Sequence, residues 1–154
     1  MTMDTSSFFN YPTLTGEEPA LEAGLLAGSS QQDWDTLLAY TETRRLHPGD
    51  WLIREGEHDR ALYVLSDGAL EAIVPGRASR VIEAPATVGE LAFLDGRPRA
   101  AGLRALTHGE AQRLSFEAFE ALSAREPRLA RDLLLDLGRI VAARLRSALE
   151  AERD

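Results

Sequence analysis

The residues best suited to chemistry lie together in one stretch that carries an acid, a base and several small side chains. In chain order they are Gly89, Glu90, Leu91, Ala92, Arg99, Ala100 and Ala101. The small residues allow the backbone to approach a ligand closely, and the first amides of a short helical turn would offer N–H donors to an anion. Arg99 can add charge-assisted hydrogen bonds to a phosphate, whereas an ionised Glu90 only accepts and needs a hydroxyl donor such as a ribose 2′-OH. Together these residues predict a site for a nucleotide monophosphate.

The same stretch also admits a structural explanation. Thr87-Val88-Gly89-Glu90 fits a capping box, in which Glu90 would tie off a helical turn and pair with Arg99 without any ligand. The small residues around the acid and the base favour the binding interpretation. Arg97, two residues before Arg99, is expected to be solvated rather than to bind.

Composition and charge narrow the classes of partner. All 17 basic residues are arginine, which removes lysine chemistry and leaves a side chain suited to bidentate anion recognition. The net charge of -8 opposes binding to nucleic acid or to anionic lipid. The start of the chain lacks the pattern of a secretory signal, and no apolar run approaches the length of a membrane span. We therefore expect a cytoplasmic protein with no nucleic-acid and no membrane partner.

Signatures of catalysis and of metal binding are missing from the sequence. There is no cysteine, and His47, His58 and His108 do not form an HxH or HxxxH spacing, which disfavours a cupin-like metal enzyme on a β-barrel. The sequence contains no Walker loop, Ser/His/Asp motif or paired-acid signature. We expect no enzyme activity, no metal and no cofactor.

The first two thirds of the chain predict an N-terminal helical part followed by a β domain. Residues 1–16 lack periodicity and are expected to form a flexible arm, followed by helices near 19–27 and 31–39. From 41 to 115, short apolar runs are broken by turn signals, which is typical of a small barrel or sandwich. Asp67-Gly68 predicts the clearest hairpin.

Residues 116–151 predict helices again. From Pro127 onward, apolar residues recur every three or four positions for over twenty residues, which indicates one long amphipathic helix. This helix is either core or a dimer seam. Its apolar stripe is longer than the β domain that it could cover, which slightly favours the seam.

In these features the sequence resembles the cyclic-nucleotide-binding domain family, whose phosphate-binding cassette reads Gly-Glu-Leu-Ala, a short spacer, then Arg-Ser/Thr/Ala-Ala. The spacer and arginine look particularly like the regulatory subunit of cyclic-AMP-dependent protein kinase. Upstream the resemblance covers Pro48-Gly49-Asp50, Glu55-Gly56, Leu62-Tyr63-Val64-Leu65 and Gly68. It implies an α+β fold over residues 17–154: an eight-stranded antiparallel β jelly-roll barrel (a double-stranded β-helix), flanked by N-terminal helices and a long C-terminal helix.

The resemblance also implies roles for single residues. Arg99 would bind the exocyclic phosphate oxygens, Glu90 would accept from the ribose 2′-OH, and Gly89, Leu91, Ala92, Ala100 and Ala101 would supply amides or close walls. Ala100 stands where kinases selective for cyclic GMP tend to carry a hydroxyl residue, which favours cyclic AMP over cyclic GMP as the ligand.

The sequence departs from the family in two respects: the residue that recognises the nucleotide base and the DNA-binding domain that transmits the signal. Catabolite-activator-type regulators bond adenine through a hydroxyl residue on the long helix, and the alignment places Ala148 there, beside Ser147. Arg144, Arg146 and Ser147 are then the candidate caps for the base. Those regulators continue into a helix-turn-helix domain, whereas this chain stops at Asp154, so we expect no DNA-reading head.

Two functions follow. In the first, cyclic AMP binds and the helices after Ser115 move onto the base, exposing or hiding a surface for an unidentified effector protein. In the second, the chain is a ligand-free interaction module that dimerises through residues 127–150.

Overall fold

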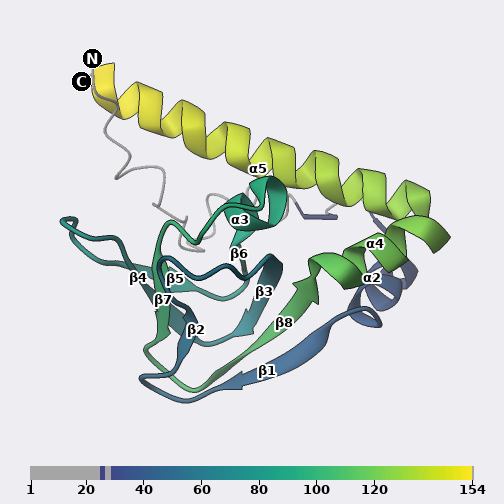
Figure 1. Cartoon of the computed structure of the whole chain (residues 1–154), viewed down its shortest axis with the longest axis horizontal. Helices are drawn as coiled ribbons and strands as arrows, with labels where there is room; N and C mark the ends of the chain where they lie inside the picture. Colours follow the sequence, from purple (N-terminus) through teal and green to yellow (C-terminus); the bar gives the residue numbers. More distant parts are fainter. Residues whose placement is uncertain (1–24, 27–28, 154) are drawn as a thin grey trace.

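The computed structural model describes residues 25–26 and 29–153 and contains two four-stranded antiparallel sheets (Figure 1). The first sheet has the strand order β1-β8-β3-β6 and the second β2-β7-β4-β5. The strands are β1 (Glu42–Leu46), β2 (Trp51–Ile53), β3 (Ala61–Asp67), β4 (Ala69–Ile73), β5 (Arg80–Glu83), β6 (Ala86–Val88), β7 (Gly102–Ala105) and β8 (Gly109–Ser115). The predicted eight antiparallel strands are present and form a sandwich of the jelly-roll type. Its two sheets are open, because within the described residues no ladder joins the edges of one sheet to the other.

The core between the sheets follows from the alternation of side chains along each strand. In β4, for example, Leu70 and Ala72 are buried while their neighbours Glu71 and Ile73 are partly exposed. Leu70 lies opposite Ile82 on β5 and Ala105 on β7. Each fully buried aliphatic side chain of this kind stabilises the fold by about 1.5–3 kcal/mol.

The turn at Gly68 lies where expected but does not close a hairpin. Gly68 has a φ of +94°, and a Cβ there would lie 2.7 Å from the backbone oxygen of His108, so glycine is required. The strands on its two sides belong to different sheets, because β3 pairs with β6 and β8, whereas β4 pairs with β5 and β7. A hairpin is found instead at Pro75-Gly76, between β4 and β5.

In the part of the chain that the structure describes, four helices accompany the sheets: α2 (Gln31–Leu38), α3 (Glu90–Asp95), α4 (Phe116–Arg125) and α5 (Pro127–Arg153). The hydroxyl of Ser30 accepts a hydrogen bond from the Asp33 amide and starts α2 as predicted. The 27 residues of α5 form the predicted long C-terminal helix, with Pro127 in its first turn. The predicted arm 1–16 and most of the predicted helix 19–27 lie outside the described residues.

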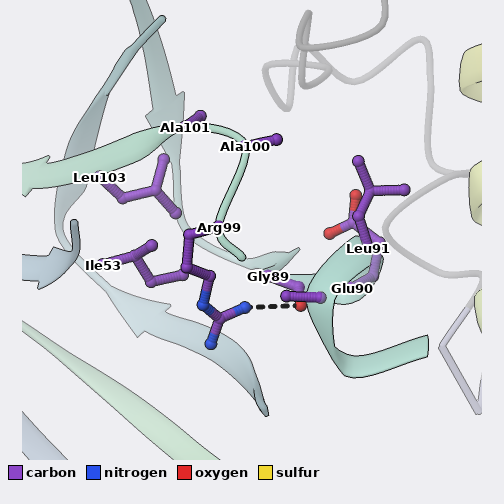
Figure 2. A pocket seen from close by; sticks show the side chains of 9 residues that line it. Ile53, Gly89, Glu90, Leu91, Arg99, Ala100, Ala101 and Leu103 are labelled. Carbon is purple, nitrogen blue, oxygen red and sulfur yellow. Dashed lines mark hydrogen bonds between the residues drawn. The ribbon is translucent and has the colours of Figure 1, made fainter. Parts of the chain in front are cut away.

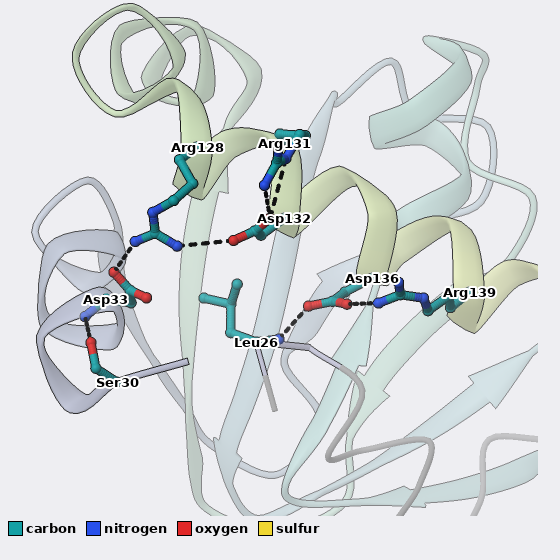
Figure 3. A network of polar contacts seen from close by, with 8 residues as sticks. All are labelled: Leu26, Ser30, Asp33, Arg128, Arg131, Asp132, Asp136 and Arg139. Atoms are coloured by element: carbon teal, nitrogen blue, oxygen red, sulfur yellow. Dashed lines mark hydrogen bonds and ion pairs between the residues drawn. The ribbon is translucent and has the colours of Figure 1, made fainter. Parts of the chain in front are cut away.

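Helix α5 lies along one side of the molecule, above α3 and in contact with α4 (Figure 1). Its inward leucines, with Phe93 from α3 and Leu122 from α4, form a second buried cluster. Polar contacts also fasten α5 to the N-terminal part (Figure 3): Arg128 donates to Asp33 at 2.8 Å, and Asp136 accepts from the backbone amide of Leu26 at 2.8 Å. None of the helices that the structure describes is both long enough and apolar enough to cross a membrane.

Candidate functional site

The seven predicted ligand residues all line one pocket, formed by α3 and by the segment that leads into β7 (Figure 2). Two further lining residues, Ile53 on β2 and Leu103 on β7, were missed at the sequence level because their apolar side chains are indistinguishable from core. The pocket is open to solvent.

Gly89 sets the geometry of the turn into α3. Its φ is +80°, and a Cβ at this position would lie 2.8 Å from Nη1 of Arg99. No side chain caps the start of α3, so the capping-box explanation is wrong. At the other end of the helix, Arg60 donates to the carbonyls of Phe93 and Leu94 at 2.9 Å and 3.2 Å. The helix is therefore fixed at both ends by this backbone conformation and by Arg60.

Arg99 lies beneath the pocket and is only 4% exposed. Its Nη1 donates to the carbonyl of Gly89 at 2.9 Å (Figure 2), and its Nη2 donates to the carbonyl of Ala61 at 2.7 Å. The same Nη2 lies 3.3 Å from Oδ2 of Asp59. The Nε of Arg99 is buried and has no hydrogen-bond partner among the residues that the structure describes. The guanidinium is thus held in place on one side and retains an unused donor.

Asp59 holds two arginines at once. Its Oδ1 accepts from Nη2 of Arg113 at 2.9 Å, and its Oδ2 also accepts from the hydroxyl of Tyr63 at 3.3 Å. Burial by itself would raise the pKa of the Asp59 carboxyl, but the Arg113 hydrogen bond and the charges of Arg99 and Arg113 outweigh it and hold that pKa below its usual value. The carboxylate is therefore charged at neutral pH.

Asp59→Asn should cost more stability at neutral pH than in acid. Because the folded-state pKa of Asp59 is depressed, its stabilising contribution is present above the unfolded value of 3.8 and is lost as the pH falls through the lower folded value. Urea denaturation at pH 6 and at pH 3 measures this. The free-energy gap between wild type and variant should shrink at pH 3, and a gap that stays constant or grows would contradict this assignment.

Glu90 is 2% exposed and pairs with Arg144, which was proposed from the sequence as a cap for the base. Its Oε1 forms an ion pair with Nη1 of Arg144 on α5, and Nη2 of Arg144 donates to the carbonyl of Thr87 at 3.3 Å. The sequence also allowed Glu90 to pair with Arg99 in the absence of ligand. In the structure Glu90 pairs with Arg144 instead. The second oxygen, Oε2, is buried and finds no hydrogen-bond partner within residues 25–26 and 29–153.

The three candidate base caps lie in different places on α5. Arg144 is 6% exposed, and its guanidinium forms the ion pair with Glu90. Arg146 and Ser147 are exposed, and neither belongs to the nine lining residues of the pocket. Ala148, at the position expected to carry a hydroxyl, is fully buried. Arg97 is exposed, as predicted.

Histidines and acids are not gathered into a metal centre. The rings of His47 and His108, distant in sequence, do meet at 5.3 Å, and Asp50 lies 3.5 Å from Nδ1 of His47. Within the described ranges, however, no three His, Asp or Glu side chains are placed to hold a metal ion.

Comparison with known proteins agrees with this geometry. The sequence model described as the cyclic nucleotide-binding domain matches residues 43–126, more than half of the chain. The chain belongs to the cyclic nucleotide-binding domain family. This membership supports cyclic nucleotide binding in a regulatory role.

Solved structures of this family share the fold. A cyclic nucleotide-binding domain from Methylobacillus flagellatus superposes with a TM-score of 0.74 at 26% identity, covering 87% of this chain and 80% of the other. The catabolite activator protein of Thermus thermophilus gives a TM-score of 0.71 at 27% identity, covering 84% of this chain and 62% of the other.

Among curated proteins, this cyclic nucleotide-binding domain is similar to parts of larger chains. The cAMP-dependent protein kinase regulatory subunit of Emericella nidulans is 34% identical over 88 residues, which are 53% of this chain and 20% of that protein. An uncharacterized NTE family protein of Mycobacterium tuberculosis is 26% identical over 118 residues, which are 76% of this chain and 20% of the relative. The chain thus spans about a fifth of the length of these relatives.

Proposed function

We propose that this domain binds cyclic AMP at residues 89–101 and reports its presence to an effector protein through α5, without catalysing a reaction. One observation carries the proposal: among the described residues, two that line the same pocket each have a buried polar atom without a hydrogen-bond partner, the donor Nε of Arg99 and the acceptor Oε2 of Glu90. Buried polar groups are rarely left unpaired in proteins. A ligand that carries an anionic phosphate next to a ribose hydroxyl would satisfy both groups.

The phosphate would lie at Arg99 and the 2′-hydroxyl at Glu90. Arg99 is held by two backbone carbonyls and Asp59, so it needs little reorganisation before it binds. The small side chains of Ala100 and Ala101 leave room on the wall beside it. Ala100 offers no hydroxyl to guanine, which favours cyclic AMP over cyclic GMP.

The Glu90–Arg144 ion pair gives the route from the pocket to α5. A ribose hydroxyl that bonds Oε2 would act on a carboxylate that already holds α5 through its other oxygen. Binding would then bias the equilibrium between two arrangements of α5, since a ligand shifts an equilibrium by its difference in affinity for the two states. An effector protein that contacts α5 in only one arrangement would read the signal.

The ribose contact is tested by changing both of its partners. Wild type should bind cyclic AMP about tenfold more tightly than 2′-deoxy cyclic AMP, because a hydrogen bond to a charged group contributes about 1.5 kcal/mol or more. Glu90→Gln should reduce this preference to about threefold or less. Thermal shift and calorimetric titration with both ligands measure the cycle, and an unchanged preference in the variant would exclude Glu90 as the ribose acceptor.

A second candidate function is dimerisation through α5 without any ligand. One face of this helix leaves Leu134, Leu145 and Leu149 between 40% and 44% exposed. Leu145→Glu would place a charge in such a seam. Sedimentation velocity should then give a dimer for wild type and a monomer for the variant, with or without cyclic AMP. A wild type that is monomeric at all concentrations would exclude this function.

A further inference from the structure

The arginine that we assign to the phosphate shares its carboxylate partner with a second arginine outside the pocket. Asp59 contacts Arg99 at 3.3 Å through Oδ2 and Arg113 at 2.9 Å through Oδ1. The second contact is the shorter of the two. Two guanidinium groups and one carboxylate leave a net charge of +1 in this cluster.

This sharing matters because a carboxylate paired with Arg99 alone would cancel the charge that an anionic ligand needs. Arg99 is almost fully buried, its side chain being 3% exposed, and solvent therefore screens this balance only weakly. The side chains of Asp59 and Arg113 are 26% and 21% exposed. Glu42, opposite Arg113 on β1, is exposed, and solvent screens its charge.

The fold determines this arrangement at a distance from the pocket. Arg113 lies on β8 directly opposite Tyr63 on β3, and the hydroxyl of Tyr63 donates to Asp59. Arg113 is not one of the residues that line the pocket. It can therefore change the charge at the site without touching the ligand.

We propose that Arg113 is a positioning residue that determines affinity. Because Arg113 also pairs with the Asp59 carboxylate, that carboxylate neutralises Arg99 only in part, and the remaining positive charge of Arg99 can attract the ligand's phosphate. This inference rests on the proposed cyclic nucleotide site. It predicts that affinity follows the net charge of Asp59, Arg99 and Arg113 rather than the number of contacts that remain. Removing Arg113 alone brings that charge to zero, whereas removing Arg113 together with the charge of Asp59 restores it to +1.

The test is a calorimetric titration of cyclic AMP into the full chain and five variants, one of them a control. Arg113→Gln should weaken binding about tenfold at low salt, and less at ~0.15 M salt. Arg113→Lys, which keeps the charge, should stay within about threefold of wild type. The double variant Asp59→Asn/Arg113→Gln should recover to within about threefold of wild type, and Asp59→Asn alone should bind at least as tightly as wild type. Arg125→Gln, an equal charge change on the exposed end of α4, is the control and should have no effect.

The outcomes separate this inference from the function on which it rests. If wild type binds and Arg113→Gln binds equally well, Arg113 has no such role. If the double variant is no better than Arg113→Gln, the residue acts through structure alone and the charge account is wrong. If Arg113→Gln does not fold, the affinities of wild type, Asp59→Asn and the double variant for cyclic AMP decide the question. Asp59→Asn should bind at least as tightly as wild type and the double variant within about threefold of it, and a weaker Asp59→Asn would contradict the charge account. A wild type that binds no cyclic nucleotide overturns the proposed function and this inference with it.

Discussion

Arg99→Ala is expected to weaken the binding of cyclic AMP at least a hundredfold. The guanidinium would supply up to two charge-assisted hydrogen bonds to the phosphate, each contributing about 1.5–3 kcal/mol, and a loss of about 3 kcal/mol corresponds to roughly two orders of magnitude in Kd. Calorimetric titration of wild type and variant measures the ratio. Arg99→Lys keeps the charge but not the planar fork, and should give an intermediate affinity.

The matched control for this variant is Arg97→Ala. Arg97 is exposed and lies two residues away in the same segment, so its removal should change the affinity less than about threefold. Because Arg99 also satisfies the carbonyls of Gly89 and Ala61, circular dichroism must first establish that Arg99→Ala is folded. A folded Arg99→Ala variant that binds as tightly as Arg97→Ala would contradict the assignment of the phosphate site.

Arg144→Met should have the largest effect on stability among the site variants. Glu90 and Arg144 are 2% and 7% exposed in their side chains, and removing one partner leaves the other charge buried. Breaking a buried ion pair in this way costs about 3–5 kcal/mol. Urea denaturation at pH 7 should show this loss in the free energy of unfolding.

Removing both charges should restore much of that stability. In Glu90→Gln/Arg144→Met no uncompensated charge stays buried. The double variant is therefore expected to unfold at a higher urea concentration than Arg144→Met. Arg146→Met, an exposed arginine half a turn further along the same helix, should change the free energy of unfolding by less than about 0.5 kcal/mol. If Arg144→Met were as stable as Arg146→Met, the ion pair would not hold α5 to the pocket.

The pocket itself could be predicted from the sequence because its parts are close together in the chain. Residues 89–101 form one turn, one short helix and one loop, and their small side chains and charges suffice to indicate an anion site. The long amphipathic helix was predictable for the same reason, since its periodicity is a local property.

The supports of the pocket could not be predicted because they arise from distant pairings. Asp59 meets Arg113 only because β3 pairs with β8, and Glu90 meets Arg144 only because α5 packs over α3. The hairpin predicted at Asp67-Gly68 was wrong for a related reason. A tight turn fixes the local direction of the chain, whereas the sheet that each strand joins depends on partners much further along the sequence.

The central claim is that the pocket at residues 89–101 binds a cyclic nucleotide, and calorimetric titration of the wild-type chain with cyclic AMP tests it most directly. We predict saturable heat with one nucleotide per chain and a Kd of about 1 µM or below, equivalent to about −8 kcal/mol, with weaker binding of cyclic GMP. Absence of heat with either nucleotide up to millimolar concentration would contradict the account.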